Sequence, residues 1–226
     1  MRFNINYKLL EHAHTTLFAK ENLYWLVGGA GSGKTVISQS LSAKYHIPVY
    51  DMDAHIYGTY HNRFSSEQHP VNSAWSASQN GFAWLLDMTW SDFNHFNQAA
   101  LVEYLDLLCE DIGRSYVDTK LIIDGGVCNP SILTQVLSPR QIICLANLTQ
   151  SSEDIWESEE RKSMQEMTYQ LPNPEEAWRK FLEFDAKITA TILKESQENG
   201  ITVLVRKTNE TVDELTARVA NFFAMD

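Results

Sequence analysis

A run of glycines between an apolar segment and a helix-like segment constrains the fold of this chain more than any other feature. The stretch WLVGGAGSGKTVISQSL occupies residues 25–41, and four of the six residues from Gly28 to Gly33 are glycine. Glycine is costly in ordered structure, because it loses more conformational freedom on folding than any other residue. In such a loop, successive backbone N–H groups turn inward around a phosphate, and side chains would block that approach. The stretch therefore predicts a phosphate-binding loop.

The residues beside the glycines match the pattern of phosphate-binding loops, in which glycine, lysine and a hydroxyl residue follow an earlier glycine at fixed spacing. We expect Lys34 to reach the β- and γ-phosphates of ATP, and the Thr35 hydroxyl to ligate Mg²⁺. A helix that begins near Lys34 adds the positive end of its dipole. The nucleotide-binding residues predicted from the loop are Gly28, Gly29, Ala30, Gly31, Ser32, Gly33, Lys34, Thr35 and Val36.

Short apolar segments alternate with helix-like segments along the chain. The strand-like segments are residues 23–27, 46–53, 120–126, 141–148 and 201–206. The helix-like segments are residues 5–20, 35–45, 97–112, 174–200 and 211–223, and a polar helical tract covers 151–170. This alternation predicts a parallel sheet with helices on both faces. We therefore expect one α/β domain over residues 1–226, with the three-layer fold of P-loop NTPases and a five-stranded parallel sheet.

Composition excludes several classes of protein. The net charge is −11, and an acidic surface repels the backbones of DNA and RNA. No apolar run reaches the roughly 18 residues of a membrane span, and the N-terminus lacks the ordered regions of a signal peptide. We therefore expect a cytoplasmic protein without general nucleic-acid or membrane binding. Cys109, Cys128 and Cys144 lie far apart, which favours buried thiols over a zinc site.

Several large classes of nucleotide-binding protein carry motifs that this sequence lacks. It has no Asn-Lys-x-Asp run for guanine and no transporter signature, and it is short for a helicase or a ring ATPase. The segments VYDMDAHI (49–56) and LIIDGG (121–126), taken with the glycine-rich loop, resemble the shikimate kinase and adenylate kinase group of small P-loop kinases. The shikimate kinase-like branch is the most similar.

The resemblance implies roles for acids and glycines that follow two of the strands. Asp51 is expected near Mg²⁺ and the reacting hydroxyl, and Asp53 is expected to bind the acceptor's hydroxyl groups. Asp124 is expected to hold a Mg²⁺-bound water, and Gly125 and Gly126 to form a turn that contacts the acceptor. The alternative interpretation is structural, since acids at strand ends also cap the helices that follow.

Two later segments resemble the lid and the adenine-binding loop of the same kinases. ESEERKSMQEM lies within the proposed lid, residues 151–170, and Arg161 and Lys162 are its only bases. The resemblance implies that Arg161 closes over the phosphates. Alternatively, these two bases form a solvated helical face that pairs with nearby glutamates. VRKTNETVDEL lies where such kinases wrap the adenine, which adds Arg206 to the predicted nucleotide-binding residues.

The region from the second strand through the long helix is acidic. Residues 45–113 contain one base, Arg63, and nine acids. A kinase that acts on a nucleoside monophosphate normally brings several arginines to its phosphate. We therefore predict a small neutral or cationic acceptor with a hydroxyl group, with Arg63 as the local partner for any carboxylate. The predicted residues are Lys34, Asp51 and Arg161 for catalysis, Asp53, Arg63, Gly125 and Gly126 for the acceptor, and Thr35, Asp124 and Asp51 for the metal.

Residues 56–96 lie outside the resemblance and are rich in aromatic side chains. These are Tyr57, Tyr60, Phe64, Trp75, Phe82, Trp84, Trp90, Phe93 and Phe96. The segment is too long for a simple loop in a compact domain, so we expect a helical insert that binds the acceptor. The aromatic side chains either give this insert a small core of its own or form the walls of an acceptor pocket.

The sequence favours a kinase that transfers the γ-phosphoryl group of ATP–Mg²⁺ to an alcohol. One rival is a nucleotide-dependent ATPase or regulatory binding module without a small-molecule acceptor, because the lid pattern of shikimate kinases is missing and the insert is unmatched. A second rival is an antibiotic-modifying or toxin-like kinase, because the acidic acceptor region suits a cationic substrate.

Overall fold

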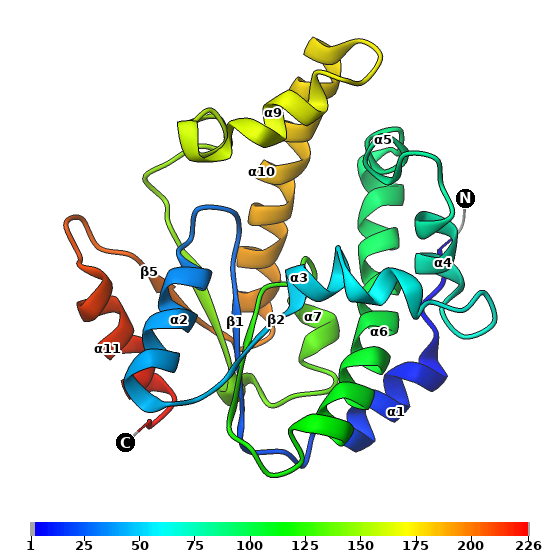
Figure 1. Ribbon diagram of the computed structural model, residues 1–226. Helices are drawn as coiled ribbons and strands as arrows, with labels where there is room; N and C mark the ends of the chain where they lie inside the picture. The colour runs from blue at the N-terminus through cyan, green and yellow to red at the C-terminus, as the bar shows by residue number, and fades with distance from the viewer. Residues whose placement is uncertain (1–2, 226) are drawn as a thin grey trace.

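The computed structural model describes residues 3–225 and has a parallel β-sheet at its centre (Figure 1). The strands are β1 (Leu23–Val27), β2 (Val49–Asp51), β3 (Leu121–Asp124), β4 (Ile142–Ala146) and β5 (Thr202–Val205). They are all parallel and are ordered β2-β3-β1-β4-β5 across the sheet. The prediction of an α/β fold with a five-stranded parallel sheet is confirmed.

The helices are of very different lengths. They are α1 (Tyr7–Leu17), α2 (Lys34–Tyr45), α3 (Met52–Ile56), α4 (Pro70–Ser76), α5 (Gly81–Leu86), α6 (Trp90–Ser115), α7 (Pro130–Leu133), α8 (Ser152–Trp156), α9 (Lys162–Thr168), α10 (Pro174–Glu198) and α11 (Val212–Phe222). Three short 3₁₀ turns are η1 (Thr59–Asn62), η2 (Pro139–Gln141) and η3 (Glu159–Arg161). The polar tract 151–170 is therefore three short helical pieces, α8, η3 and α9.

The two faces of the sheet bury different side chains, because successive residues of a strand point to opposite faces. Leu26, Ile122 and Ile143 pack with residues of α2 and α11 on one face. Trp25 and Ile123 pack with residues of α1, α6 and α10 on the other face. The protein therefore has three layers, with helices on both faces of the sheet as the sequence predicted.

The long helix α6 begins at Trp90, although the sequence predicted a helix only from residue 97. The Thr89 hydroxyl caps this helix by accepting a hydrogen bond from Asp92 N at 3.2 Å. The last residues of the predicted insert therefore form the first turns of α6. Apolar residues at helical spacing form a stripe that is buried between Leu101 and Ile112. Its members are Leu101, Leu105, Leu108 and Ile112.

The aromatic side chains of residues 56–96 do not form an independent core. Tyr60, Trp75 and Phe96 belong to the same core as the sheet residue Trp25. Phe93 instead packs on Phe184 of α10, with ring centroids 4.7 Å apart, in a second cluster. The insert is therefore attached to the sheet through one set of aromatics and to α10 through another.

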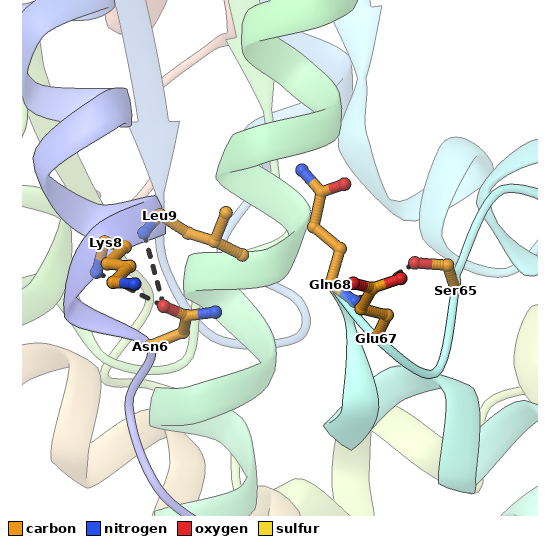
Figure 2. Close-up of a pocket in the computed structure, with 6 residues that line it drawn as sticks. All are labelled: Asn6, Lys8, Leu9, Ser65, Glu67 and Gln68. Carbon is orange, nitrogen blue, oxygen red and sulfur yellow. Dashed lines mark hydrogen bonds between the residues drawn. The ribbon is translucent and has the colours of Figure 1, made fainter.

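A shallow surface pocket lies between the start of α1 and the segment that precedes α4 (Figure 2). Its lining residues are Asn6, Lys8, Leu9, Ser65, Glu67 and Gln68. None of the predicted site residues lines it. Asn6 is occupied as the N-cap of α1, where its Oδ1 accepts from Lys8 N at 3.2 Å. The pocket is therefore separate from the predicted active site.

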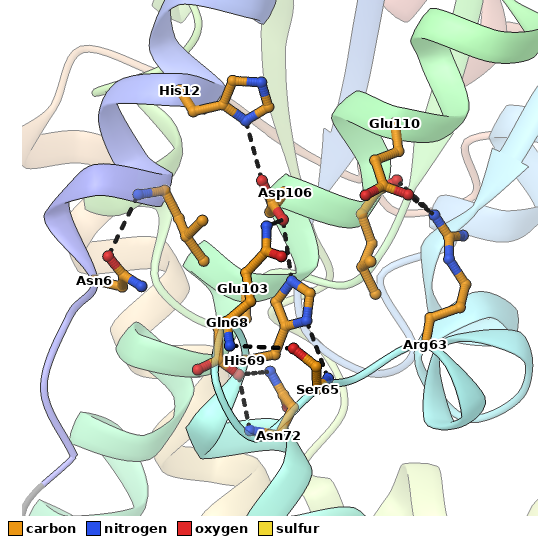
Figure 3. Close-up of polar contacts among 12 residues, drawn as sticks. Asn6, His12, Arg63, Ser65, Gln68, His69, Asn72, Glu103, Asp106 and Glu110 are labelled. Atoms are coloured by element: carbon orange, nitrogen blue, oxygen red, sulfur yellow. Dashed lines mark hydrogen bonds and ion pairs between the residues drawn. The ribbon is translucent and has the colours of Figure 1, made fainter.

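A buried polar network holds the insert against α6 (Figure 3). Asp106 of α6 accepts hydrogen bonds from His12 Nδ1 and His69 Nε2, both at 3.0 Å, and from Gln68 Nε2 at 2.8 Å. These three partners come from α1 and from the segment before α4. A buried carboxylate needs such partners, because an unpaired buried charge is strongly destabilising.

Glu103, one turn earlier on α6, is also buried and caps the start of α4. Its carboxylate accepts from Val71 N at 3.0 Å, and from Asn72 N and Asn72 Nδ2 at 2.8 Å each. Replacement by alanine leaves these donors unpaired in a site where Glu103 itself is 1% exposed. We expect Glu103→Ala to lower the free energy of unfolding by about 3–5 kcal/mol, measured by urea denaturation.

Glu110 on the same helix provides a matched control. Its side chain is 38% exposed and pairs with Arg63 at 3.1 Å and Arg114 at 3.2 Å. Because exposed ion pairs contribute little, Glu110→Ala is expected to cost about 1 kcal/mol or less. Equal losses in the two variants would show that the Glu103 carboxylate does not anchor α4.

None of the helices within residues 3–225 is long and apolar enough to cross a membrane. The three cysteines are free thiols, and the prediction that they are buried is confirmed for two of them. Cys109 and Cys144 are buried, whereas Cys128 is partly exposed. Cys128 follows the turn after β3 and therefore lies at the end of the sheet where the predicted site residues gather.

Candidate active site

The glycine-rich loop joins the end of β1 to the start of α2, above the centre of the sheet in Figure 1. Gly33 has a φ of +90°, a conformation that side chains other than glycine rarely adopt. A Cβ atom on Gly28 would lie 2.3 Å from Leu145 O, and one on Gly29 would lie 2.2 Å from Thr189 Oγ1 of α10. Close packing therefore requires these two glycines, and backbone conformation requires Gly33.

The first turn of α2 presents backbone N–H groups at the end of this loop. Gly33 occupies the N-cap position and supplies no side-chain cap. The Ile37 N–H donates to Gly33 O at 3.0 Å, so the N–H groups of Lys34, Thr35 and Val36 precede the hydrogen-bonded ladder of the helix. Uncapped N–H groups and the positive end of the helix dipole attract an anion to this position.

The Lys34 ammonium folds back over the loop. Its Nζ donates to Gly28 O at 2.9 Å and to Gly29 O at 3.2 Å. Its positive charge also lowers the pKa of the Asp53 and Asp124 carboxyls, against the opposite effect of burial. Lys34 therefore lies within electrostatic reach of both the loop and the two acids.

Asp124 ends β3 and is only 3% exposed. Its Oδ2 accepts a hydrogen bond from the Ser38 hydroxyl at 3.2 Å, whereas its Oδ1 is buried without a partner. Burial raises the pKa of Asp124, and the nearby Thr35 and Ser38 hydroxyls together with the charge of Lys34 partly offset this. This carboxylate oxygen lies beside two hydroxyls on α2. A buried polar atom without a hydrogen-bond partner destabilises the folded protein unless a ligand binds it.

Asp53 lies across the turn that follows β3. Its Oδ1 accepts a hydrogen bond from Gly126 N at 3.1 Å. Gly125 has a φ of +76°, and a Cβ atom there would lie 2.4 Å from Asp53 Oδ2. The structure thus brings together Asp53, Gly125 and Gly126. Asp51 pairs with Asp124 in the strand register, and its Oδ1 caps α3 by accepting from Ala54 N at 2.9 Å.

The three arginines predicted for the site are engaged elsewhere. Arg63 pairs with Glu110 at 3.1 Å and with Asp111 at 2.8 Å, both on α6. Arg161 lies over the Trp156 ring, 4.6 Å from its centroid, between α8 and α9. Arg206 follows β5 and donates to Glu210 O at 3.1 Å. Neither Arg63 nor Arg161 contacts Asp53 or the glycine-rich loop in this state.

Several residues beside the loop were not predicted from the sequence. Ile155 of α8 packs where a Cβ atom on Gly31 would lie, at 2.8 Å, and Thr189 of α10 packs against Gly29. Ser152 of α8 donates to Asp185 Oδ2 of α10 at 2.6 Å, which ties the lid segment to that helix. These contacts join segments far apart in the chain, and no local pattern signals them.

Tyr57, one of the aromatic residues considered above as a wall of an acceptor pocket, lies next to Asp53 in the chain's first turn after β2, whereas Tyr104 was not among those residues. Tyr57 follows Asp53 by one helical turn, and its N–H donates to Asp53 O at 3.0 Å. That spacing was a usable signal, because residues four apart lie on one face of a helix. Tyr104 belongs to α6 and packs beside the rings of Tyr60 and Phe64, with centroids 6.5 and 6.0 Å away.

No protein-family model matches the chain, and a search of curated proteins gave no match. The fold and the arrangement of the residues therefore carry the functional argument.

Proposed function

We propose that the protein is a P-loop kinase that transfers the γ-phosphoryl group of ATP to a hydroxyl group of a small neutral or cationic acceptor. The observation that carries this proposal is the orphaned, buried Oδ1 of Asp124 beside the first turn of α2. A glycine-rich loop in front of a helix N-terminus suits a polyphosphate, and an acid at the neighbouring strand end suits its metal ion. The parallel sheet and its strand order support the same assignment.

The residues present fit Mg²⁺ held jointly by the protein and the triphosphate. Thr35 would be a direct ligand, and Asp124, with Asp51 nearby in register, would hold metal-bound water. Mg²⁺ keeps several waters and uses few protein ligands beside substrate phosphates. Within residues 3–225, no three His, Cys, Asp or Glu side chains are grouped so that they could hold a metal ion by themselves. The ion would neutralise charge on the phosphates.

The chain's own groups would position the reacting atoms, which is the main requirement of phosphoryl transfer. Lys34 would leave its two carbonyl partners and bind the β- and γ-phosphates, which accept the same N–H groups. Asp53 would hold the acceptor's hydroxyl and accept its proton, since burial raises the pKa of this carboxyl and makes it a stronger base. Arg161 would swing from Trp156 when the lid closes.

Two measurements on the full chain test the proposal. Calorimetric titration with ATP in the presence and absence of Mg²⁺ is expected to show binding that depends on the metal ion. ADP release is then measured with and without candidate acceptors, and a phosphorylated product is identified by mass spectrometry. Failure to bind any nucleoside triphosphate would rule out the whole proposal. Nucleotide binding with ADP release that no acceptor stimulates would favour the ATPase or regulatory module instead.

A further inference from the structure

The glycine-rich loop is packed, at two of its glycines, against segments that lie far from it in the sequence. A Cβ atom on Gly31 would lie 2.8 Å from Ile155 Cδ1 of α8, and one on Gly29 would lie 2.2 Å from Thr189 Oγ1 of α10. A Cβ atom on Gly33, in contrast, would meet no atom of the described chain within 4 Å. The loop is therefore in close contact with α8 and α10 and has open space beside its last glycine.

The helix that carries Ile155 is held on α10 by two contacts of different kinds. The Ser152 hydroxyl donates to Asp185 Oδ2 at 2.6 Å, and Asp185 is only 8% exposed. One turn later, the Trp156 ring packs edge-on against the Phe181 ring, with centroids 4.9 Å apart and an interplanar angle of 75°. Ile155 lies between these two contacts in the chain and is 9% exposed. The position of Ile155 against the loop is therefore fixed by α10.

The start of α8 is fixed by its own side chains as well. Ser151 Oγ accepts from Asp154 N at 3.1 Å, and Asp154 Oδ2 accepts from Ser151 N at 2.8 Å, which makes a capping box. A helix of five residues is too short to be stable by itself. The cap and the contacts with α10 therefore keep α8 folded beside the loop.

The rest of the predicted lid, residues 157–172, is held differently. In the described part of the chain, no hydrogen bond joins these residues to α10 or to the glycine-rich loop. The ion pair between Lys162 and Glu159, at 3.7 Å, joins side chains that are 57% and 89% exposed, and such pairs contribute little stability. Leu171 packs with apolar residues of α10. The contacts thus divide the lid after Trp156 into a fixed first part and a second part that is free of polar ties to α10.

A fixed neighbour matters to this loop because glycine-rich backbone is costly to order. Each ordered residue loses conformational entropy, and glycine loses the most. Where packing orders a loop when the protein folds, that loss is not subtracted from the affinity for a ligand. Contacts of Ile155 with Gly31 and of Thr189 with Gly29 would order the loop in this way, with its backbone N–H groups ready for a phosphate.

We propose that Ile155 and Thr189 are positioning residues that hold the glycine-rich loop in its phosphate-binding conformation. They act through the loop and do not themselves touch the nucleotide. α8 accordingly stays on α10 throughout the reaction, and the movement of the lid that carries Arg161 begins after Trp156. The inference rests on the proposed kinase function and adds the residues that preorganise its donor site.

The test measures binding of ATP–Mg²⁺ to the full chain by calorimetry. Ile155→Ala and Thr189→Ala are each expected to raise the Kd at least fivefold, because the loop must then be ordered when ATP binds. Thr189 is only partly buried, so its truncation tests the contact with little effect on folding. Ile155→Val keeps a branched side chain against Gly31 and is expected to stay within twofold of the wild-type Kd.

Leu9→Ala is the matched control for the loss of a buried aliphatic side chain. Leu9 is 8% exposed and belongs to the main core on α1, away from the loop. This variant is expected to lower the thermal midpoint and to leave the Kd for ATP–Mg²⁺ unchanged. A fivefold rise in Kd in Leu9→Ala would show that any loss of core packing weakens the site, and would overturn the inference.

Hydrogen exchange on the wild type tests the division of the lid. Peptides from residues 159–172 are expected to exchange at least threefold more slowly when ATP–Mg²⁺ is bound, and peptides covering α8 are expected to change less. Equal slowing in both would show that α8 moves with the rest of the lid. Wild-type ATP binding with an unchanged Kd in both Ile155→Ala and Thr189→Ala would overturn this inference alone. A wild type that binds no ATP would overturn the proposed function, and the inference with it.

Discussion

Replacing Lys34 by alanine is expected to abolish most of the nucleotide-dependent behaviour of this protein. Its ammonium is the one side-chain cation that contacts the glycine-rich loop within residues 3–225, through Gly28 O at 2.9 Å and Gly29 O at 3.2 Å. Loss of a preorganised donor aimed at developing phosphate charge costs about 10²–10³-fold in turnover. We therefore expect acceptor-stimulated ADP release to fall by about that factor in Lys34→Ala.

ATP is expected to stabilise the wild type against heat, and the same variant is expected to lose that stabilisation. A ligand at 100 times its Kd stabilises a protein by about 2.7 kcal/mol, and weakened binding removes most of that gain. Lys44→Ala is the control, because Lys44 lies in the last turn of the same helix and packs its ammonium over the Tyr45 ring, 5.3 Å from the centroid. Wild-type turnover in Lys34→Ala, or an equal loss in Lys44→Ala, would contradict the proposed role of the loop.

The sheet and the glycine-rich loop could be predicted because their signals are local. Each strand is a short apolar run bounded by polar residues or glycine, and the predicted segments 23–27, 120–126, 141–148 and 201–206 each contain a strand. The cap of the last helix is another local feature, since Thr211 Oγ1 accepts from Glu214 N at 3.2 Å. Such features depend on neighbours in the sequence and hardly at all on distant packing.

The sequence did not predict the start of α6, because the first turns of this helix pack against two different parts of the protein. Trp90 and Phe93 pack on Phe184 of α10, and Phe96 belongs to the main core, so apolar side chains point in more than one direction there. A single helical stripe is therefore absent, and the segment resembles an aromatic loop when read alone. The aromatic side chains that point away from the main core are buried by the packing of α10 against α6.

The partners of Arg63 in the predicted acceptor region also depend on tertiary packing. The sequence offered Arg63 as the one base among many acids, but it could not say which acids would use it. In the structure the guanidinium is taken by Glu110 and Asp111 and lies over the Tyr60 ring, 5.1 Å from its centroid. Local patterns predicted the glycine-rich loop and the acids at the strand ends, whereas tertiary packing decides which partners Arg63 has.

Replacing Asp53 by asparagine is expected to separate ATP binding from transfer. The amide oxygen of asparagine can still accept from Gly126 N, which Asp53 Oδ1 binds at 3.1 Å, so the turn after β3 is preserved. The variant loses the charge and the basicity needed to hold the acceptor's hydroxyl and take its proton. Loss of a positioned general base lowers rates by about 10²–10⁴-fold, and we expect kcat to fall within that range.

ATP affinity in Asp53→Asn is expected to stay at the wild-type value or to increase, because a negative charge near Lys34 and the phosphates has been removed. Calorimetry with ATP–Mg²⁺ and acceptor-dependent ADP release measure the two effects independently. Asp118→Asn is the control, since Asp118 is exposed and precedes β3, at the opposite end of that strand from Asp124. If Asp53→Asn keeps its kcat, the proton passes directly to the phosphate or to solvent, and Asp53 acts only in binding. If the variant loses ATP affinity as well, Asp53 belongs to the donor side of the site, and the division of the two sides at the β3 turn is wrong.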